Sequence, residues 1–221
     1  MIDILLVGKG KMGLEIAKLS KNIKDCISNK DELKQLSATY QGIIDFSHPD
    51  NTNEILKYAL KHNLPLVIGT TNLSYEQEKL IDQASKRIPI CYESNFSLAY
   101  QKIKKALINL VSLKTKKIII IDIHHISKID SPSGTAKDLK KYLKKLFPSI
   151  EIEIISHRKG NVVGIHKIVI LEDNDTMELS FKIHKREEFA LNALKALNIL
   201  SFKEKGLYSY DNLVNENEKN K

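Results

Sequence analysis

Hydrophobic positions in the first part of the chain follow two patterns that alternate. Continuous apolar runs of strand length occupy residues 2–7, 42–46, 65–68 and 89–92. Between these runs, apolar residues recur at helical spacing, as in residues 12–19, 53–63 and 74–87. Continuous apolar strands that alternate with amphipathic helices are typical of a parallel sheet covered on both faces. The pattern therefore predicts a doubly wound α/β domain that ends at about residue 95.

The pattern changes in the second half of the chain. We expect helices at residues 98–113, 136–147 and 187–201, and strands at 116–125, 151–155, 166–171 and 177–183. In the last of these strands apolar and polar residues alternate, which indicates one buried face and one wetter face. The polar residues 215–221 predict a frayed end. This half of the chain reads as a region of α+β type.

A glycine-rich turn follows the first predicted strand. Gly8-Lys9-Gly10-Lys11-Met12-Gly13 is a G-x-G-x-x-G pattern placed between a strand and a helix. Such a turn brings backbone N–H groups and a helix N-terminus against a pyrophosphate, and the two lysines add positive charge. The sequence therefore predicts a dinucleotide site here. The plainer alternative is a tight turn that binds nothing.

The segment about 20 residues beyond the glycine turn bears on the choice of cofactor. Dinucleotide sites often hold the ribose with an acidic residue about 20 positions beyond the glycines. Cys26-Ile27-Ser28-Asn29-Lys30 offers no acid at the expected strand end, and its polar residues would suit a 2′-phosphate. On that interpretation NADPH is used at least as well as NADH. The alternative is that the segment is only a loop.

Two further turns lie at the carboxyl ends of predicted parallel strands, where ligands of open α/β sheets bind. One contains Phe46 and Ser47, and the other contains Gly69, Thr70 and Thr71. Alone, each is weak evidence for a site. Together with the glycine turn they mark one edge of one sheet, which makes them candidates for cofactor binding.

The richest segment begins where the long strand at 116–125 ends. His124 and His125 are followed by Lys128 and by a Ser133-Gly134-Thr135 turn at the start of a helix. Adjacent histidines on a strand point to opposite faces, so these two have different roles. Ser133 is a good N-cap, and free N–H groups behind it would bind a carboxylate. We expect an anion pocket with a titratable group, and no metal, because no carboxylate or cysteine stands at ligand spacing.

Composition narrows the function classes. The formal charge of +8 comes from 35 basic and 27 acidic residues, and the only arginines are Arg87, Arg158 and Arg186. Nucleic-acid recognition relies on arginine, so a dispersed lysine excess predicts no nucleic-acid partner and favours small anions instead. Two cysteines make no disulfide framework, and no apolar run is long enough to span a membrane. We therefore expect a cytoplasmic protein without a membrane partner.

Eight blocks of sequence carry a resemblance to a known family. They are VGKGKMG at 7–13, IDFSHP at 44–49, VIGTT at 67–71, SNFS at 94–97, HHISKIDSPSGTA at 124–136, GNVVGIH at 160–166, REEFALNA at 186–193 and GLYSYDNLV at 206–214. In these blocks, which cover nearly the whole chain, the sequence resembles the dihydrodipicolinate reductases (4-hydroxy-tetrahydrodipicolinate reductases) of lysine and diaminopimelate biosynthesis. The loop between residues 147 and 156 is shorter than the family's pattern.

The resemblance implies a fold and an activity. It implies a Rossmann-type dinucleotide-binding domain at residues 1–96 and 187–221. Residues 97–186 would form an α+β domain with a mixed sheet that binds substrate and builds a homotetramer. The implied reaction is NADPH- or NADH-dependent reduction of a cyclic dicarboxylate, in which hydride reaches the ring and a positioned acid adds the proton.

The resemblance also implies roles for single residues. His124 matches the catalytic histidine and Lys128 the proton-donating lysine. The candidates for substrate binding are His125, Lys128, Ser133, Gly134 and Thr135. Besides the three turns at the sheet edge, the candidates for cofactor contact are Glu93, Ser94, Asn95, Phe96, Arg186 and Phe189.

Three other functions stay open on the sequence alone. The first is a catalytically silent or redox-sensing dinucleotide-binding protein of the same fold. The second is a nucleic-acid-binding module driven by the positive charge, and the third is a reductase of the same fold that acts on another small acid.

Overall fold

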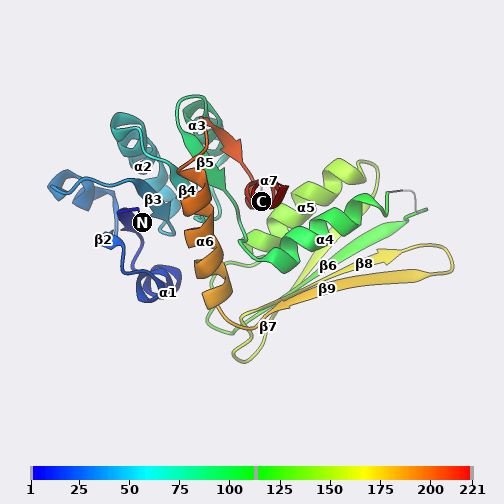
Figure 1. Cartoon of the computed structure of the whole chain (residues 1–221). Coiled ribbons are helices and arrows are strands. Elements are labelled where there is room, and N and C mark those ends of the chain that lie inside the picture. Colours follow the sequence, from blue (N-terminus) through cyan, green and yellow to red (C-terminus); the bar gives the residue numbers. More distant parts are fainter. Residues whose placement is uncertain (1, 112–113, 220–221) are drawn as a thin grey trace. The chain divides into compact units, whose positions relative to one another are not determined.

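The chain folds into two compact units, each built on its own β-sheet (Figure 1). The structure is a computed structural model that describes residues 2–111 and 114–219. The first unit comprises Met1–Phe96 with Glu187–Lys221, and the second comprises Ser97–Arg186.

A parallel sheet of six strands forms the centre of the first unit. The strand order is β10-β5-β4-β3-β1-β2, and every neighbouring pair runs parallel. The strands are β1 (Ile4–Val7), β2 (Ile23–Ile27), β3 (Gly42–Asp45), β4 (Leu66–Ile68), β5 (Pro89–Tyr92) and β10 (Gly206–Tyr208). Because all strands point the same way, the turns that follow β1, β3 and β4 meet at one edge of the sheet.

Helices cover both faces of this sheet. One face packs against α1 (Lys11–Leu19), α6 (Glu187–Leu200) and α7 (Tyr210–Lys219), and the other against η1 (Lys30–Gln35), α2 (Pro49–His62) and α3 (Tyr75–Ser85). Side chains of β1 point alternately to the two faces of the sheet. Ile4 and Leu6 pack in the core under α1, α6 and α7, and Leu5 and Val7 pack in the core under η1, α2 and α3. Burial on both faces explains why these strands are continuously apolar.

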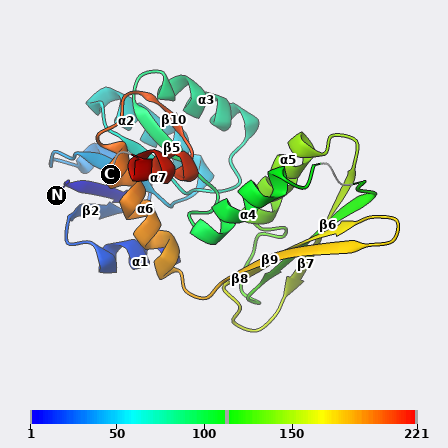
Figure 2. The same cartoon turned by 45° about the vertical axis from the view of Figure 1, so that its right-hand side comes forward.

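The second unit has a mixed sheet in the order β7-β6-β8-β9. Its strands are β6 (Lys117–His124), β7 (Glu151–Arg158), β8 (Gly164–Leu171) and β9 (Thr176–Ile183). Strands β6 and β7 run parallel, whereas β8 is antiparallel to both of its neighbours. Helices α4 (Leu98–Ile108) and α5 (Gly134–Leu146) pack on this sheet (Figure 2).

Side chains alternate strictly along β6, the strand that leads to the candidate site. Ile118, Ile120, Asp122 and His124 are buried on the helix-covered face, and the residues between them are half-buried on the other face. Asp122 and His124 therefore lie on the same buried face of β6 as the core residues Ile118 and Ile120. This placement follows from the period of two in a strand.

The α/β class and the mixed second sheet confirm the expected fold, with differences at the ends of elements. Helix α4 ends at Ile108, where Asn109 turns its N–H onto Ala106 and Leu107, so the expected helix to residue 113 is too long, and its last two residues lie outside the described ones. The expected frayed end is also wrong in part, because α7 continues to Lys219. Leu213 and Val214 bury its first turns in the core. The short edge strand β10 was not expected.

None of the helices in residues 2–111 and 114–219 has the length and apolar character needed to cross a membrane.

Candidate active site

The glycine turn after β1 has the shape that a pyrophosphate needs. Gly8 has a φ of +113°, and a Cβ there would lie 2.3 Å from the carbonyl oxygen of Phe46. A Cβ on Gly13 would lie 1.7 Å from the carbonyl oxygen of Gly8, so only glycine allows the helix to start this close to the strand. A Cβ on Gly10, in contrast, would meet none of the described atoms within 4 Å. The first and third glycines close the turn, and the middle one leaves room.

The N-terminus of α1 opens onto that room. Gly10 is the N-cap and offers no side-chain hydrogen bond to the first turn. The first N–H groups of a helix have no partner within it and bind anions well. Lys9 and Lys11 are exposed beside them, whereas Met12 packs against the core. These residues therefore fit the pyrophosphate of a dinucleotide.

An acid does stand at the carboxyl end of β2, although it comes from beyond the segment where the sequence pattern places it. The Glu32 carboxylate in η1 accepts the N–H of Ser28 at 2.8 Å and lies 3.5 Å from the Lys9 ammonium. The Ser28 hydrogen bond, with help from Lys9, lowers the pKa of Glu32. Lys30 is turned away, since its ammonium donates to the carbonyl of Asp50 at 3.3 Å.

The turns after β3 and β4 lie against each other, as their positions in the sheet predict. A Cβ on Gly69 would fall 2.2 Å from the Phe46 ring, so the ring lies directly over this glycine. The N–H of Ser47 donates to the hydroxyl of Thr70 at 3.0 Å. Thr70 is buried and Thr71 is half-buried. The structure therefore brings the two candidate turns together with the glycine turn, because the Gly8 position touches Phe46.

The segment after β5 serves mainly to hold the first unit together. The Glu93 carboxylate accepts the N–H of Tyr210 at 3.1 Å, at the start of α7. The ring of Phe96 packs against Phe46 and Tyr210, each with centroids 5.7 Å apart. Asn95 is also buried, and Phe189 packs against the same core. Ser94 Oγ is buried without a hydrogen-bond partner among the described residues, which leaves it as the polar atom of this segment free for a ligand.

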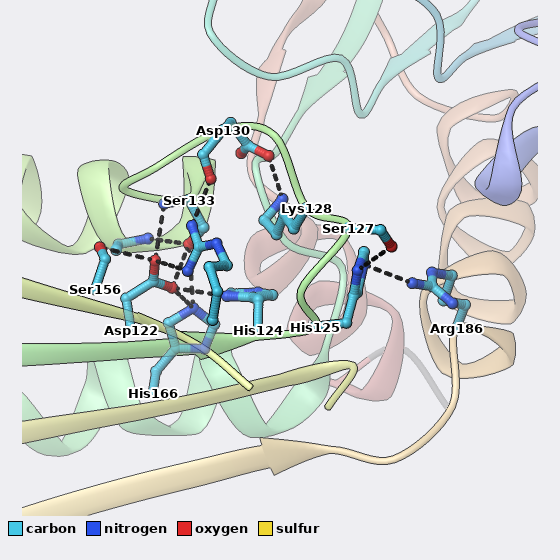
Figure 3. Close-up of polar contacts among 12 residues, drawn as sticks. Asp122, His124, His125, Ser127, Lys128, Asp130, Ser133, Ser156, His166 and Arg186 are labelled. Carbon is cyan, nitrogen blue, oxygen red and sulfur yellow. Dashed lines mark hydrogen bonds and ion pairs between the residues drawn. The ribbon is translucent and has the colours of Figure 1, made fainter. Parts of the chain in front are cut away.

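In the second unit, the buried carboxylate of Asp122 lies beside His124 on the same strand (Figure 3). Oδ1 of Asp122 lies 2.9 Å from Nδ1 of His124 and 3.2 Å from Nε2 of His166. Asp122 and His124 are two residues apart on β6, and His166 is the direct cross-strand partner of Asp122 on β8. Strand period and register therefore place all three side chains on one face.

Ser133 ties the start of α5 to the same carboxylate. Its N–H donates to Asp122 Oδ2 at 3.0 Å and its hydroxyl donates to Oδ1 at 2.7 Å. The same hydroxyl accepts the N–H of Ala136 at 3.2 Å, which makes Ser133 the N-cap of α5. Ser133 was a candidate for substrate binding, but these contacts use its polar atoms to position the helix.

Lys128 and the N-terminus of α5 contact a carboxylate of the chain itself, that of Asp130. The Lys128 ammonium lies 2.6 Å from Oδ1 of Asp130. Burial alone would raise the pKa of Asp130, but the Lys128 ion pair and the Gly134 N–H hold it below its usual value. Arg158 fixes this loop from behind, since its guanidinium donates to the Asp130 carbonyl at 2.5 Å and lies 3.5 Å from Asp122.

His125 points away from His124, as the strand alternation predicts, and contacts Arg186. Its Nε2 lies 3.2 Å from the Arg186 guanidinium, and its Nδ1 lies 2.8 Å from the Ser127 hydroxyl (Figure 3). Arg186, a candidate for cofactor contact, is therefore joined to a candidate for substrate binding. Thr135 is buried in the first turn of α5.

The structure removes one reason for expecting no metal here. Asp122, His124 and His166 each offer a ligand atom, and these atoms lie within 4.8 Å of one another. The carboxylate needed for ligand spacing is thus present, two residues before His124. Its oxygens, however, already accept hydrogen bonds from Ser133, and the Arg158 guanidinium adds a positive charge beside it. These contacts favour a hydrogen-bonded network of Asp122, His124 and His166 over a metal site formed by the same three residues.

Comparison with known proteins identifies the family. A family model described as the N-terminus of dihydrodipicolinate reductase matches residues 26–96, and one described as its C-terminus matches residues 98–214. The chain belongs to the dihydrodipicolinate reductase family. It is 36% identical to a 4-hydroxy-tetrahydrodipicolinate reductase of Wigglesworthia glossinidia brevipalpis over 93% of this chain and 79% of the relative. It is 35% identical to the enzyme of that name from Rickettsia rickettsii, over 96% of this chain and 99% of the relative.

Solved structures agree with this family in fold. A dipicolinate-bound dihydrodipicolinate reductase from a Paenisporosarcina species matches with a TM-score of 0.68 and 20% identity, over 95% of this chain and 98% of that one. A myo-inositol dehydrogenase from Corynebacterium glutamicum matches with a TM-score of 0.61 and 14% identity, over 97% and 93% of the two chains. The dihydrodipicolinate reductase family thus shares its architecture with other dehydrogenases.

Sequence reasoning missed several residues of the site. Asp122 carries a usable signal, because it stands two positions before His124 on a strand and so shares its face. His166 and Arg158 reach Asp122 in the second unit through strand register. Glu32 reaches the end of β2 in the first unit through the path of η1. Asp45 was not among the candidate residues, although it directly precedes the candidates Phe46 and Ser47.

Asp45 at the end of β3 has an unusual protonation equilibrium. Its Oδ1 accepts the N–H and the hydroxyl of Ser47 at 2.9 and 2.6 Å, while Oδ2 is buried without a hydrogen-bond partner among the described residues. Burial raises the pKa of Asp45 to about 6, although hydrogen bonds from Ser47 and Thr70 oppose it. The folded state therefore holds this proton more tightly than the unfolded state does.

We predict that Asp45 makes the protein less stable as the pH rises from about 4 to about 6. Its contribution is fully present below the unfolded pKa of 3.8 and is lost above the folded value of about 6. The linkage is worth about 3 kcal/mol for a shift of this size. Urea unfolding at a series of pH values should show this decline in the wild type and a flatter curve in Asp45→Asn. The exposed control Asp82→Asn should keep the wild-type curve, and equal slopes in all three proteins would contradict the prediction.

Proposed function

We propose that the protein reduces 4-hydroxy-tetrahydrodipicolinate (dihydrodipicolinate) to tetrahydrodipicolinate with NADH or NADPH, in lysine and diaminopimelate biosynthesis. One observation carries the proposal beyond the family name. The Lys128 ammonium and the Gly134 N–H hold the carboxylate of Asp130, at the strand end where His124 lies. This pocket binds a carboxylate from the chain, and a carboxylate is what the substrate presents.

The chain's own residues divide the work as follows. The substrate carboxylate replaces Asp130 on Lys128 and at the N-terminus of α5, with His125 and Thr135 nearby. The substrate loses its 4-hydroxyl group as water to give the dihydro form, and the reduced nicotinamide, when bound, would supply the hydride to that ring. Lys128 then gives a proton from its ammonium to the reduced ring, with His124 assisting. A positioned proton donor of this kind is worth on the order of 10²–10⁴ in rate.

We predict that Lys128→Ala and His124→Ala each lower kcat by about 10² to 10⁴-fold, because each removes part of the proton donor. Their dissociation constants for NADH, measured by fluorescence, should stay within about twofold of the wild type, since both residues lie in the second unit. Lys145→Ala removes an exposed lysine from the end of α5 and serves as the control. Unchanged turnover in Lys128→Ala would contradict the reductase and favour a silent or redox-sensing dinucleotide-binding protein.

We infer a preference for NADH over NADPH from Glu32. A carboxylate at the end of β2 suits the 2′-hydroxyl of a ribose and repels a 2′-phosphate. The Ser28 hydrogen bond and the Lys9 ion pair fix Glu32 there, and Lys30 is engaged with Asp50. This contact pattern reverses the expectation drawn from the strand end alone.

We predict that the wild type has a higher kcat/KM with NADH than with NADPH. Glu32→Gln keeps the shape of the side chain and removes its charge, so the ratio should move toward NADPH by about tenfold. Dissociation constants of both nucleotides, from fluorescence titration, should move in parallel. Glu54→Gln, in an exposed position on α2, is the control. A wild-type preference for NADPH would rule out this role of Glu32.

We also propose that the second unit assembles the protein as a homotetramer through the open face of its sheet. The half-buried residues on that face include Ile119, Ile121 and Ile123 on β6 and Ile165, Val169 and Leu171 on β8. Lys167, whose ammonium lies 3.8 Å from the Glu178 carboxylate, is on the same face between Ile165 and Val169. The apolar side chains on either side of it favour an interaction surface. Charged residues such as Lys117 and Glu153 surround it and form an ion pair at 2.8 Å.

We predict that Val169→Glu breaks the assembly into smaller species, because it places a charge among the apolar side chains of this face. Light scattering coupled to size-exclusion chromatography should give the mass of four chains for the wild type and a smaller mass for the variant. Lys195→Gln changes the net charge equally at an exposed position on α6 and should stay tetrameric. A monomeric wild type would contradict the proposal.

The two free cysteines, Cys26 and Cys91, support a reducing compartment such as the cytoplasm. The expectation that no nucleic acid binds stays a prediction.

A further inference from the structure

Asp122 is a fully ionised carboxylate in the core of the second unit. Its relative exposure is 0%, and burial alone would raise its pKa. Hydrogen bonds from His124, His166 and Ser133 instead hold the pKa of Asp122 far below its usual range. Ser156 adds a hydroxyl at 3.3 Å and Arg158 a guanidinium nitrogen at 3.5 Å. These contacts therefore favour the ionised form of Asp122 in spite of its burial.

The contacts around Asp122 are divided between its two oxygens. Oδ2 receives the Ser133 N–H, the Ser156 hydroxyl and the Arg158 guanidinium, which anchor the carboxylate to α5 and β7. Oδ1 lies 2.9 Å from Nδ1 of His124, with the Ser133 hydroxyl and His166 as its other neighbours. One oxygen is held by the scaffold, and the other is directed at the two imidazoles.

His166 completes the orientation of the carboxylate without sharing its charge. Burial lowers the pKa of His166, although its contact with Asp122 opposes this, so the fold favours the neutral form of the ring. The ring stacks on Phe181 with centroids 4.9 Å apart and planes at 18°. His166 is 2% exposed and His124 is 7% exposed, so His124 keeps the wider access to solvent.

The far side of the His124 ring faces Gly164, the first residue of β8. A Cβ at Gly164 would lie 3.2 Å from Nε2 of His124, which is tight contact. The imidazole is therefore bounded by Asp122 at Nδ1 and by a residue without a side chain at Nε2. This arrangement leaves Nε2 as the nitrogen that can reach a ligand.

We propose that Asp122 is a positioning residue that acts through His124. The 2.9 Å contact between its Oδ1 and Nδ1 of His124 favours the Nδ1–H tautomer and the present ring orientation, and it leaves Nε2 to exchange the proton. Its charge also stabilises the imidazolium whenever Nε2 is protonated. The inference rests on the proposed function, because it assigns Asp122 a part in proton delivery by His124 and Lys128.

The test uses the intact protein and Asp122→Asn, which keeps the size of the side chain and removes its charge. We expect kcat to fall by about 10 to 100-fold, as for other residues that orient a reacting ligand, while KM for the substrate changes less than threefold. The limb of the kcat pH profile that His124→Ala abolishes should move to lower pH in Asp122→Asn. Asp173→Asn, an exposed acid in the second unit, is the matched control and should retain wild-type kinetics.

Two measurements separate positioning from a general structural role. In a His124→Ala background, Asp122→Asn should cause no further loss of kcat, because the residue through which it acts is gone. If the double variant instead lost kcat by the product of the two single effects, the proposal would be overturned. Long-range ¹H–¹⁵N correlation spectra of the wild type should show His124 as the Nδ1–H tautomer when neutral, and this result does not require a stable variant. An Nε2–H tautomer would overturn it.

The remaining outcomes distinguish this inference from the proposed function. Full activity of a folded Asp122→Asn would overturn the positioning role alone. A wild type without reductase activity would overturn the proposed function and the catalytic role of Asp122 with it. Loss of wild-type activity in EDTA, restored by Zn²⁺, would overturn the proposal in favour of a metal site at Asp122, His124 and His166.

Discussion

The second unit is organised around one buried negative charge. An unpaired carboxylate in a protein interior is very costly, so the fold must bring donors to Asp122 from several directions. They come from the strand itself, from the cross-strand residue on β8, from β7 and from the N-cap of α5. The register of the sheet and the start of α5 are therefore set by the same charge that lies beside His124. Stability and the candidate chemistry share one set of hydrogen bonds.

The two candidate proton carriers are held in different ways. His124 is fixed by a network centred on the fully buried carboxylate of Asp122. Lys128 stands on a loop and is held by Asp130 through a partly exposed ion pair, with both side chains about one-quarter exposed at 23% and 26%. Partly exposed pairs are worth about 1 kcal/mol, so a ligand carboxylate can take the place of Asp130. The site thus combines a rigid imidazole with an ammonium whose partner can be exchanged.

The sequence predicts local features well and distant contacts poorly. The apolar runs locate β1, β3, β4 and β5 and all four strands of the second sheet, but not β2 or β10. The glycine spacing predicts the shape of the turn at Gly8 to Gly13. Strand alternation correctly predicts that His124 and His125 point to opposite faces. The same rule would have placed Asp122, two residues before His124, on the same face as His124. His166 is 42 residues beyond His124, and only the β6–β8 register brings it to the site. Glu32 reaches the end of β2 because η1 turns back, a path that no spacing rule predicts.

The chain's own acids also limit which anions bind to its lysines. The formal charge is +8, yet one lysine at each candidate site is paired with an acid of the chain, Lys9 with Glu32 and Lys128 with Asp130. A tethered carboxylate competes at an effective concentration in the millimolar range or above. A small monoanion with a single contact cannot displace it at ordinary concentrations. A ligand with a second anionic group gains further contacts, so these pairings favour dicarboxylates and dinucleotides over simple anions.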